Sequence, residues 1–116
     1  MTTYKRGDVA LVGFVFADES GTRYRPAVVL SSRTYHKNRQ EVIVAAVTSN
    51  TDRALFGDCA LAKWEEAGLL FPFLVTGILR TIKIQTIHRR LGSVPARELM
   101  AIDANLHKIL GLTTRT

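Results

Sequence analysis

The segment Val9–Phe16 reads VALVGFVF, an unbroken run of apolar and small residues rich in valine and phenylalanine. A run of this length and composition predicts a β-strand that is buried on both of its faces. Two further runs, Ala27–Ser31 and Val42–Ser49, predict a second and a third strand. Pro26 then stands at the entrance of the second strand, where its missing N–H group does least harm. The first half of the chain is therefore expected to build a β-sheet.

Polar segments separate these strands. Ala17–Tyr24 is polar with a central glycine, which predicts a hairpin loop too long for a tight turn. Ser32–Gln40 is basic and polar, and we interpret it as a loop that leads to the third strand. His36 falls within this second loop.

The middle of the chain has weaker patterns. Leu61–Gly68 resembles a short helix that ends at its glycine. Phe73–Leu79 has the composition of a strand, and the alternation of apolar and polar residues in Thr81–Gln85 is typical of a half-exposed strand. Ile87 falls out of phase with that alternation, so this strand is expected to bend or end near Thr86.

The last segment has the clearest helical pattern. Its apolar residues recur at spacings that place them on one stripe of a helix, at Leu99, Ile102, Leu106, Ile109 and Leu110. Pro95 suits the first turn of this helix, and Gly111 stands where a helix end favours a left-handed residue. Strands first and a packed helix last predict an α+β domain, mainly β, built as a small bent barrel with helical additions.

The chain has 116 residues, so we expect one domain over residues 1–116. Lysine and arginine number 16 against 10 acidic residues, which gives a net charge of +6. This balance suits an anionic partner, such as nucleic acid, an acidic protein tail or a membrane surface.

The single cysteine, Cys59, excludes an intrachain disulfide and a cysteine-only metal site. The longest uncharged run, Ala67–Leu79, is too short for a membrane-spanning helix. The first residues do not show the pattern of a secretory signal peptide. We therefore expect a soluble protein of a reducing cytoplasm.

Four blocks of the sequence together carry a family resemblance. They are Gly7–Phe16, Arg25–Ser32 (RPAVVLSS), Val44–Ser49 (VAAVTS) and Gly57–Leu69 (GDCALAKWEEAGL). With these blocks in this order, and the amphipathic segment at the end, the chain resembles the MazF/PemK family of bacterial toxins over nearly its whole length. The first two blocks, which hold the GD and RPA motifs, are the most specific.

The resemblance implies a fold and an activity. The fold is a small SH3-like barrel of the CcdB/MazF (PemK-like) type with a C-terminal amphipathic helix, usually in a homodimer. Members of the family are mostly endoribonucleases of type II toxin–antitoxin systems, which cut single-stranded mRNA at short sequences. They need no metal or other cofactor, and they leave a 2′,3′-cyclic phosphate and a 5′-hydroxyl.

The resemblance also implies partners. A cognate antitoxin with an acidic, partly disordered tail is expected. The tail would lie across the basic groove that binds RNA, so that opposite charge speeds the encounter and the bound tail blocks the entry of RNA. Promoter DNA is expected to bind only the complex of toxin and antitoxin. The resemblance places such a protein in the prokaryotic cytoplasm, with no membrane partner.

Two catalytic positions of the family correspond to Arg25, in the RPA motif, and Thr48, at the end of the third predicted strand. RNA supplies its own nucleophile, the 2′-hydroxyl, so the enzyme must orient it and stabilise the charge that gathers on phosphorus. An arginine fork fits two phosphate oxygens and stays charged. A threonine hydroxyl is too weakly acidic to act as a base, so we interpret Thr48 as a positioning and polarising group. Without the resemblance, Arg25 is a surface arginine and Thr48 an ordinary strand residue.

Other residues are candidates for binding RNA. The resemblance makes the Ala17–Tyr24 loop a lid, which brings in Glu19 and Ser20, and Tyr24 is suited to stack on an unpaired base. His36 is the strongest candidate among the three histidines, and none of these has the spacing of a metal site. If the barrel gathers its basic loops and strand ends, they line a groove for the RNA backbone with Arg33, Lys37, Arg80 and Lys83. If it does not, this charge is a solvated surface.

Two functions of other classes suit the same fold. One is a gyrase-inhibiting toxin like CcdB, which acts by binding and performs no RNA chemistry; the presence of Arg25 and Thr48 speaks against it. The other is a non-catalytic barrel that binds RNA or a protein partner. It predicts salt-sensitive RNA binding without any cleavage product.

Overall fold

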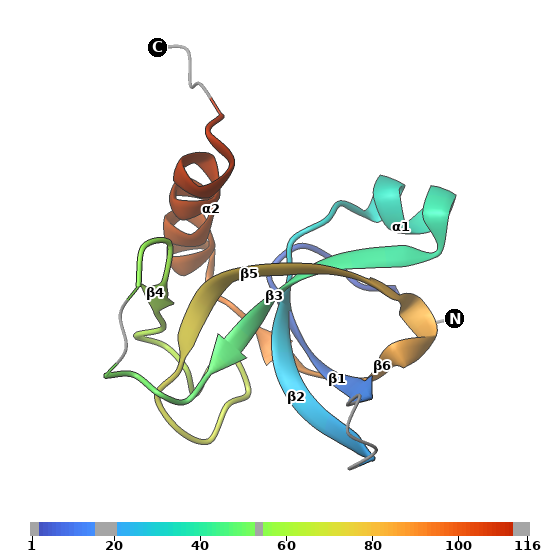
Figure 1. Ribbon diagram of the computed structural model, residues 1–116, viewed down its shortest axis with the longest axis horizontal. Helices are drawn as coiled ribbons and strands as arrows, with labels where there is room; N and C mark the ends of the chain where they lie inside the picture. The colour runs from blue at the N-terminus through green and yellow to red at the C-terminus, as the bar shows by residue number, and fades with distance from the viewer. Residues whose placement is uncertain (1–2, 16–20, 53–54, 113–116) are drawn as a thin grey trace.

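The computed structural model describes residues 3–15, 21–52 and 55–112. These residues form one antiparallel six-stranded sheet in the order β4-β5-β3-β2-β1-β6, which curves into a barrel-like shape with a helix beside it (Figure 1). The strands are β1 (Asp8–Val15), β2 (Thr22–Val29), β3 (Glu41–Thr48), β4 (Cys59–Ala60), β5 (Leu74–Lys83) and β6 (Ile87–Ser93). The helices are α1 (Arg33–Arg39), the short 3-10 helix η1 (Ile84–Thr86) and α2 (Ala96–Leu110). The predicted α+β, mainly β architecture with a C-terminal helix is confirmed.

Strand β1 is buried on both faces, as its apolar run predicts. Val9 and Val12 are both fully buried, but they belong to two different hydrophobic clusters. Val9 packs with Ile102 of α2 on one side of the sheet, whereas Val12 packs with Ile87 on the other side. The curved sheet therefore has apolar packing on both of its faces.

Strand β2 begins earlier than the sequence suggests. It starts at Thr22 rather than Ala27, and Pro26 lies inside it, paired with Leu11 of β1. The proline is tolerated because the ladder to β3 begins only at Ala27, so the other edge of β2 is unpaired at Pro26. As a result Arg25 is a strand residue, held on one side by β1.

The segment that we interpreted as a basic loop contains helix α1. Ser32 caps its N-terminus, because the Ser32 hydroxyl accepts a hydrogen bond from the N–H of Tyr35 at 3.2 Å. Gln40 ends the helix in the left-handed conformation, with φ of 58°. The loop prediction for residues 32–40 is therefore wrong, since it overlooked the capping serine.

The helix predicted over Leu61–Gly68 does not form, so this prediction is wrong as well. These residues form hydrogen-bonded turns, in which the N–H of Ala67 donates to Lys63 O and the N–H of Gly68 donates to Glu65 O. The carboxylate of Glu98, on α2, accepts hydrogen bonds from the backbone at the start of this segment. Glu98 thus fastens the start of this segment to α2, and the residues that follow form turns.

The two strands predicted in the region 73–85 form a single strand, β5, and the chain then turns through η1 into β6. The bend expected near Thr86 is confirmed, because η1 spans Ile84–Thr86. The register between β3 and β5 shifts between Ala45 and Val47. This irregularity lies in the half of β3 that leads to Thr48.

Helix α2 confirms the amphipathic pattern. It begins after Pro95 and ends at Gly111, which has φ of 67°. Ile102 is buried in the core and Ile109, in the last turn, lies against Gly57 and Gly77, whereas Leu110 is exposed. In the part of the chain that the structure describes, no helix is long and apolar enough to cross a membrane.

Candidate functional site

Arg25 and Thr48 lie at one end of the ladder between β2 and β3. The last residue pair at that end is Ala27 with Ala46, and Arg25 and Thr48 each lie two residues further along their strands. Because successive side chains of a strand alternate between its faces, both residues project from the face that carries Ala27. The fold thus brings the two residues to the same end and the same face of the sheet.

The Arg25 side chain is exposed, although its strand is firmly anchored. Its partner on β1 is Val12, whose side chain is fully buried in the core. The backbone of Arg25 is therefore held in place while its guanidinium remains accessible to solvent. Such a group can present two N–H donors to the oxygens of one phosphate.

The Thr48 side chain is half-buried at the end of β3. Its hydroxyl oxygen accepts a hydrogen bond from the N–H of Asn50 at 3.2 Å, within the turn that follows the strand. A hydroxyl has two acceptor lone pairs and one O–H donor, so this contact leaves the O–H group for a ligand. The turn thereby orients the hydroxyl without consuming its proton.

Arg80 adds a further positive charge to this face of the sheet. It lies on β5 opposite Val44 of β3, whose side chain is on the same face as Thr48. Val44 and Thr48 are four positions apart along β3, about 13 Å at roughly 3.3 Å per residue. The Arg80 side chain is exposed, so this face of the sheet carries a second cation at some distance from Arg25 and Thr48.

Tyr24, a further candidate from the first hairpin, does not join this group. Tyr24 precedes Arg25 in β2, so it projects from the opposite face of the sheet. Its exposed ring lies 5.2 Å from the ring of His88 on β6, centroid to centroid. Glu19 and Ser20 lie outside the described residues.

The basic residues of α1 form a second group, at the other end of β3. Arg33 and Lys37 are exposed on α1, which leads directly into the first residue of that strand. Lys83 is exposed as well, and it pairs with this first residue, Glu41. The eight residues of β3 separate this group from Thr48 (Figure 1). The structure therefore divides the basic candidates between two places on the molecule.

His36 has a different environment from the basic residues around it. Its ring is buried, with one nitrogen 2.6 Å from the Ser31 hydroxyl and the other 3.2 Å from the backbone oxygen of Tyr4. Both ring nitrogens are thus occupied by the protein itself. This geometry favours a structural role, in which His36 fastens α1 to the N-terminal segment, over direct contact with RNA.

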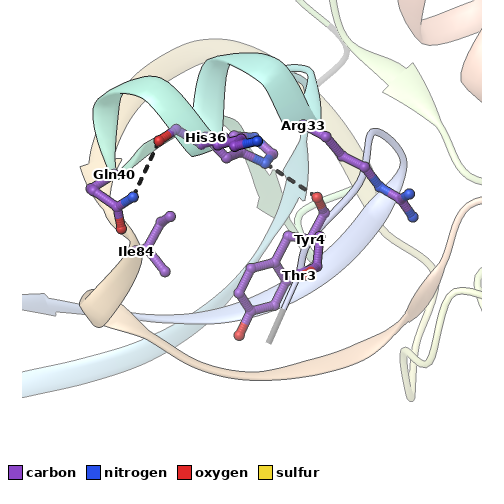
Figure 2. Close-up of a pocket in the computed structure, with 7 residues that line it drawn as sticks. Thr3, Tyr4, Arg33, His36, Gln40 and Ile84 are labelled. Carbon is purple, nitrogen blue, oxygen red and sulfur yellow. Dashed lines mark hydrogen bonds between the residues drawn. The ribbon is translucent and has the colours of Figure 1, made fainter. Parts of the chain in front are cut away.

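A cavity of about 320 Å³ opens between α1, the N-terminal segment and η1 (Figure 2). Its wall includes Tyr4, Gln40 and Ile84, none of which the sequence singles out. Burial raises the pKa of the Tyr4 phenol, and the positive charge of Arg90 opposes part of this shift. The signal that could have revealed the cavity is the capping serine before α1, since it predicts a helix over the basic segment.

Metal and thiol chemistry find little support among the described residues. Within residues 3–15, 21–52 and 55–112, no three His, Cys, Asp or Glu side chains are grouped to hold a metal ion. Burial, together with the negative charge of Glu98, raises the pKa of the Cys59 thiol. This thiol is therefore protonated at neutral pH and is a poor nucleophile.

The sequence of the whole barrel can be compared with known families. A profile of PemK-like, MazF-like toxins of type II toxin–antitoxin systems matches residues 5–110. The chain belongs to this family. The resemblance carried by the GD and RPA motifs is thereby confirmed, whereas no curated protein sequence matches the chain.

Solved structures of MazF proteins have the same fold. A MazF from Deinococcus radiodurans, in a crystal of a MazE–MazF complex, is 20% identical with a TM-score of 0.82, covering 97% of this chain and 100% of that chain. An endoribonuclease from a mycobacterial species is 17% identical with a TM-score of 0.77, covering 99% and 98%. The Mycobacterium tuberculosis toxin MazF-mt6 is 19% identical with a TM-score of 0.76, covering 92% and 99%. These similarities confirm the predicted MazF-type fold with its C-terminal helix.

Proposed function

We propose that this member of the MazF/PemK family is a sequence-selective endoribonuclease that cleaves single-stranded mRNA without a metal. The observation that carries the proposal is the placement of Arg25 and Thr48, which lie on one face and at one end of the β2–β3 ladder with the guanidinium exposed. An endoribonuclease of the same fold is known from a mycobacterial species. This pair supplies one permanent charge and one oriented hydroxyl for phosphodiester chemistry.

The reaction follows from what RNA and these two residues contribute. The 2′-oxygen forms a bond to the neighbouring phosphorus and gives up its proton, while the bond from phosphorus to the 5′-oxygen breaks and that oxygen takes a proton. The products are a 2′,3′-cyclic phosphate and a 5′-hydroxyl. Negative charge gathers on the phosphate oxygens in the transition state, and Arg25 stabilises it there more strongly than in the substrate.

Thr48 acts as a positioning group. Its oxygen already accepts the N–H of Asn50, so its O–H group donates to a phosphate oxygen or aligns the 2′-hydroxyl for in-line attack. The pKa of an alcohol lies far above neutrality, so Thr48 does not take the proton itself.

The partners follow from the family and the charge. MazF from Deinococcus radiodurans crystallises with MazE, and we propose that this chain likewise pairs with a cognate antitoxin, whose acidic tail covers the face of the sheet that carries Arg25 and Arg80. The net charge of +6 favours rapid association with such a tail and with RNA. We further propose a cytoplasmic homodimer that binds promoter DNA only in complex with the antitoxin.

Replacing Thr48 by valine is expected to lower kcat for RNA cleavage roughly tenfold. Valine keeps the β-branched shape but removes the O–H donor, and a hydrogen bond to a charged group contributes about 1.5–3 kcal/mol. Single-turnover cleavage of a long RNA measures the effect. Thr48→Ser, which retains the hydroxyl, serves as the control and should stay near the wild-type rate; a fully active valine variant would remove Thr48 from the mechanism.

Cleavage is expected to proceed at full rate in excess EDTA, because Arg25 supplies the charge that a divalent ion would otherwise contribute. The assay uses a long RNA of known sequence, and the ends of the products are mapped and chemically assigned. Cyclic phosphate and 5′-hydroxyl ends are expected. A requirement for magnesium, or 5′-phosphate ends, would contradict the mechanism, and salt-sensitive RNA binding without cleavage would favour the non-catalytic barrel.

A further inference from the structure

The cavity beside α1 has no part in the chemistry at Arg25 and Thr48. It lies at the other end of β3, where α1, the N-terminal segment and η1 meet (Figure 2). Its volume of about 320 Å³ is within the range of small-ligand pockets, roughly 300–1,000 Å³. A hollow of this size is large enough for one mononucleotide unit.

The face of α1 that lines the cavity is unusual for a helix that rests on a barrel. Its residues follow the spacing of one helical face, at Arg33, His36, Lys37 and Gln40. A helix face that closes a core is normally apolar at this spacing. Here it is cationic and polar, so α1 borders the cavity instead of filling it, and the buried His36 holds the helix at that position.

Different residues of the cavity suit a negatively charged group, a polar edge and an apolar ring of a ligand. Arg33 and Lys37 are one helical turn apart on α1, about 5–6 Å between their Cβ atoms, so both can reach one phosphate group. Gln40 donates its side-chain N–H to Lys37 O at 3.3 Å, which leaves its amide oxygen as an acceptor. Ile84 and Tyr4 supply apolar walls that pack against the barrel core.

We infer that this cavity is a second RNA-binding subsite, which holds one nucleotide of the single-stranded substrate away from the scissile bond. Arg33 and Lys37 bind its phosphate, Ile84 contacts the base, and the Gln40 oxygen accepts a hydrogen bond from the base edge. A run of acidic side chains would use the two cations but would leave the apolar walls without a partner. The inference rests on the proposed RNA-cleaving function.

The proposed subsite predicts that affinity depends on the length of the RNA. Strand β3 runs from the side of the cavity to Thr48, and its eight residues extend over about 23 Å at roughly 3.3 Å per residue. A stacked strand advances about 3.4 Å per nucleotide, so about seven nucleotides span this distance. A short oligonucleotide bound at Arg25 therefore does not occupy the cavity, whereas a longer one contacts both places.

The test compares uncleavable 2′-O-methyl oligouridylates of about four and about twelve nucleotides, a range typical of single-strand binding sites. Their affinities for the wild type and for the double variant Arg33→Ala/Lys37→Ala are measured by fluorescence anisotropy at several salt concentrations. We expect the variant to lose about tenfold or more in affinity for the longer probe and less than about twofold for the shorter one. Removing the contacts to this one phosphate should also reduce the salt slope for the longer probe by about 0.7. With long RNA as the substrate, KM should rise and kcat should stay unchanged.

A matched control separates a specific subsite from general charge. Arg97→Ala/Lys108→Ala removes two exposed positive charges from α2 and should leave the affinity for the longer probe nearly unchanged. Equal losses in both double variants would overturn the inference, as would an unchanged affinity in Arg33→Ala/Lys37→Ala. A variant that loses only the binding of an oligoglutamate peptide would assign the cavity to an acidic protein tail instead. If cleavage persists in these cases, the inference alone fails; a wild type that neither binds nor cleaves RNA removes the proposed function as well.

Discussion

Arg25→Ala is expected to lower the rate of RNA cleavage by about 10²–10³-fold, the usual loss when one donor that stabilises a transition state is removed. The guanidinium is the charged group proposed to meet the phosphate oxygens as negative charge accumulates on them. Since it is exposed, its loss removes no core packing. Single-turnover cleavage of a long RNA gives the rate, and a thermal melt reports whether the fold is intact.

Two control variants test whether the position of the positive charge matters and whether the planar shape of the guanidinium matters. Arg97→Ala removes the same charge from an exposed position on α2 and should cleave at nearly the wild-type rate. Arg25→Lys keeps the charge but loses the planar fork, so it should recover only part of the activity. Normal cleavage by a well-folded Arg25→Ala protein would exclude Arg25 from the mechanism.

Gly68→Ala is expected to destabilise the protein by about 3 kcal/mol or more, which lowers Tm by roughly 10–20 °C for a chain of this size. Gly68 has φ of 83°, a conformation that side chains with a Cβ rarely adopt. A Cβ at this position would also overlap the backbone carbonyl of Leu91 on β6. Backbone cannot rotate away as a side chain does, so the turn and the strand would have to separate.

Gly111→Ala isolates the first of these effects, the cost of a positive φ. Gly111 also has a positive φ, of 67°, but nothing lies within 4 Å of a Cβ placed there. Its replacement should therefore cost only about 1 kcal/mol, the strain of the conformation alone. Both variants are compared by thermal and urea unfolding, and similar small losses in the two would show that Gly68 does not sit against β6 as described.

The elements that the sequence predicts well are those whose own residues carry the whole signal. The run around Val9 and Val12 is apolar on every side, which is what a strand between two cores requires. The stripe through Ile102 repeats at the period of a helix, and Pro95 and Gly111 mark the two ends of α2. Each of these signals is local, so no knowledge of the rest of the fold is needed to interpret it.

The elements that were predicted wrongly depend on contacts with distant residues. Residues 61–68 have a helical composition, but they form turns whose start is held to α2 by the carboxylate of Glu98 and to Phe73 by the N–H of Leu61. Helix α1 has no apolar stripe, because the face that it turns inward borders a cavity. A search for apolar stripes in the sequence therefore overlooks helix α1.

The sequence by itself determined the family, the doubly buried strand β1 and the C-terminal helix, and through the family motifs it pointed to Arg25 and Thr48. Only the tertiary structure decided where the basic side chains lie relative to that pair: Arg80 on the same face of the sheet, and Arg33 and Lys37 beside a cavity at the far end of β3. The physical reason is that local patterns record which side chains are buried along one element. The distance between two exposed side chains depends instead on strand register and on the curvature of the sheet, which arise from pairing between segments far apart in the chain.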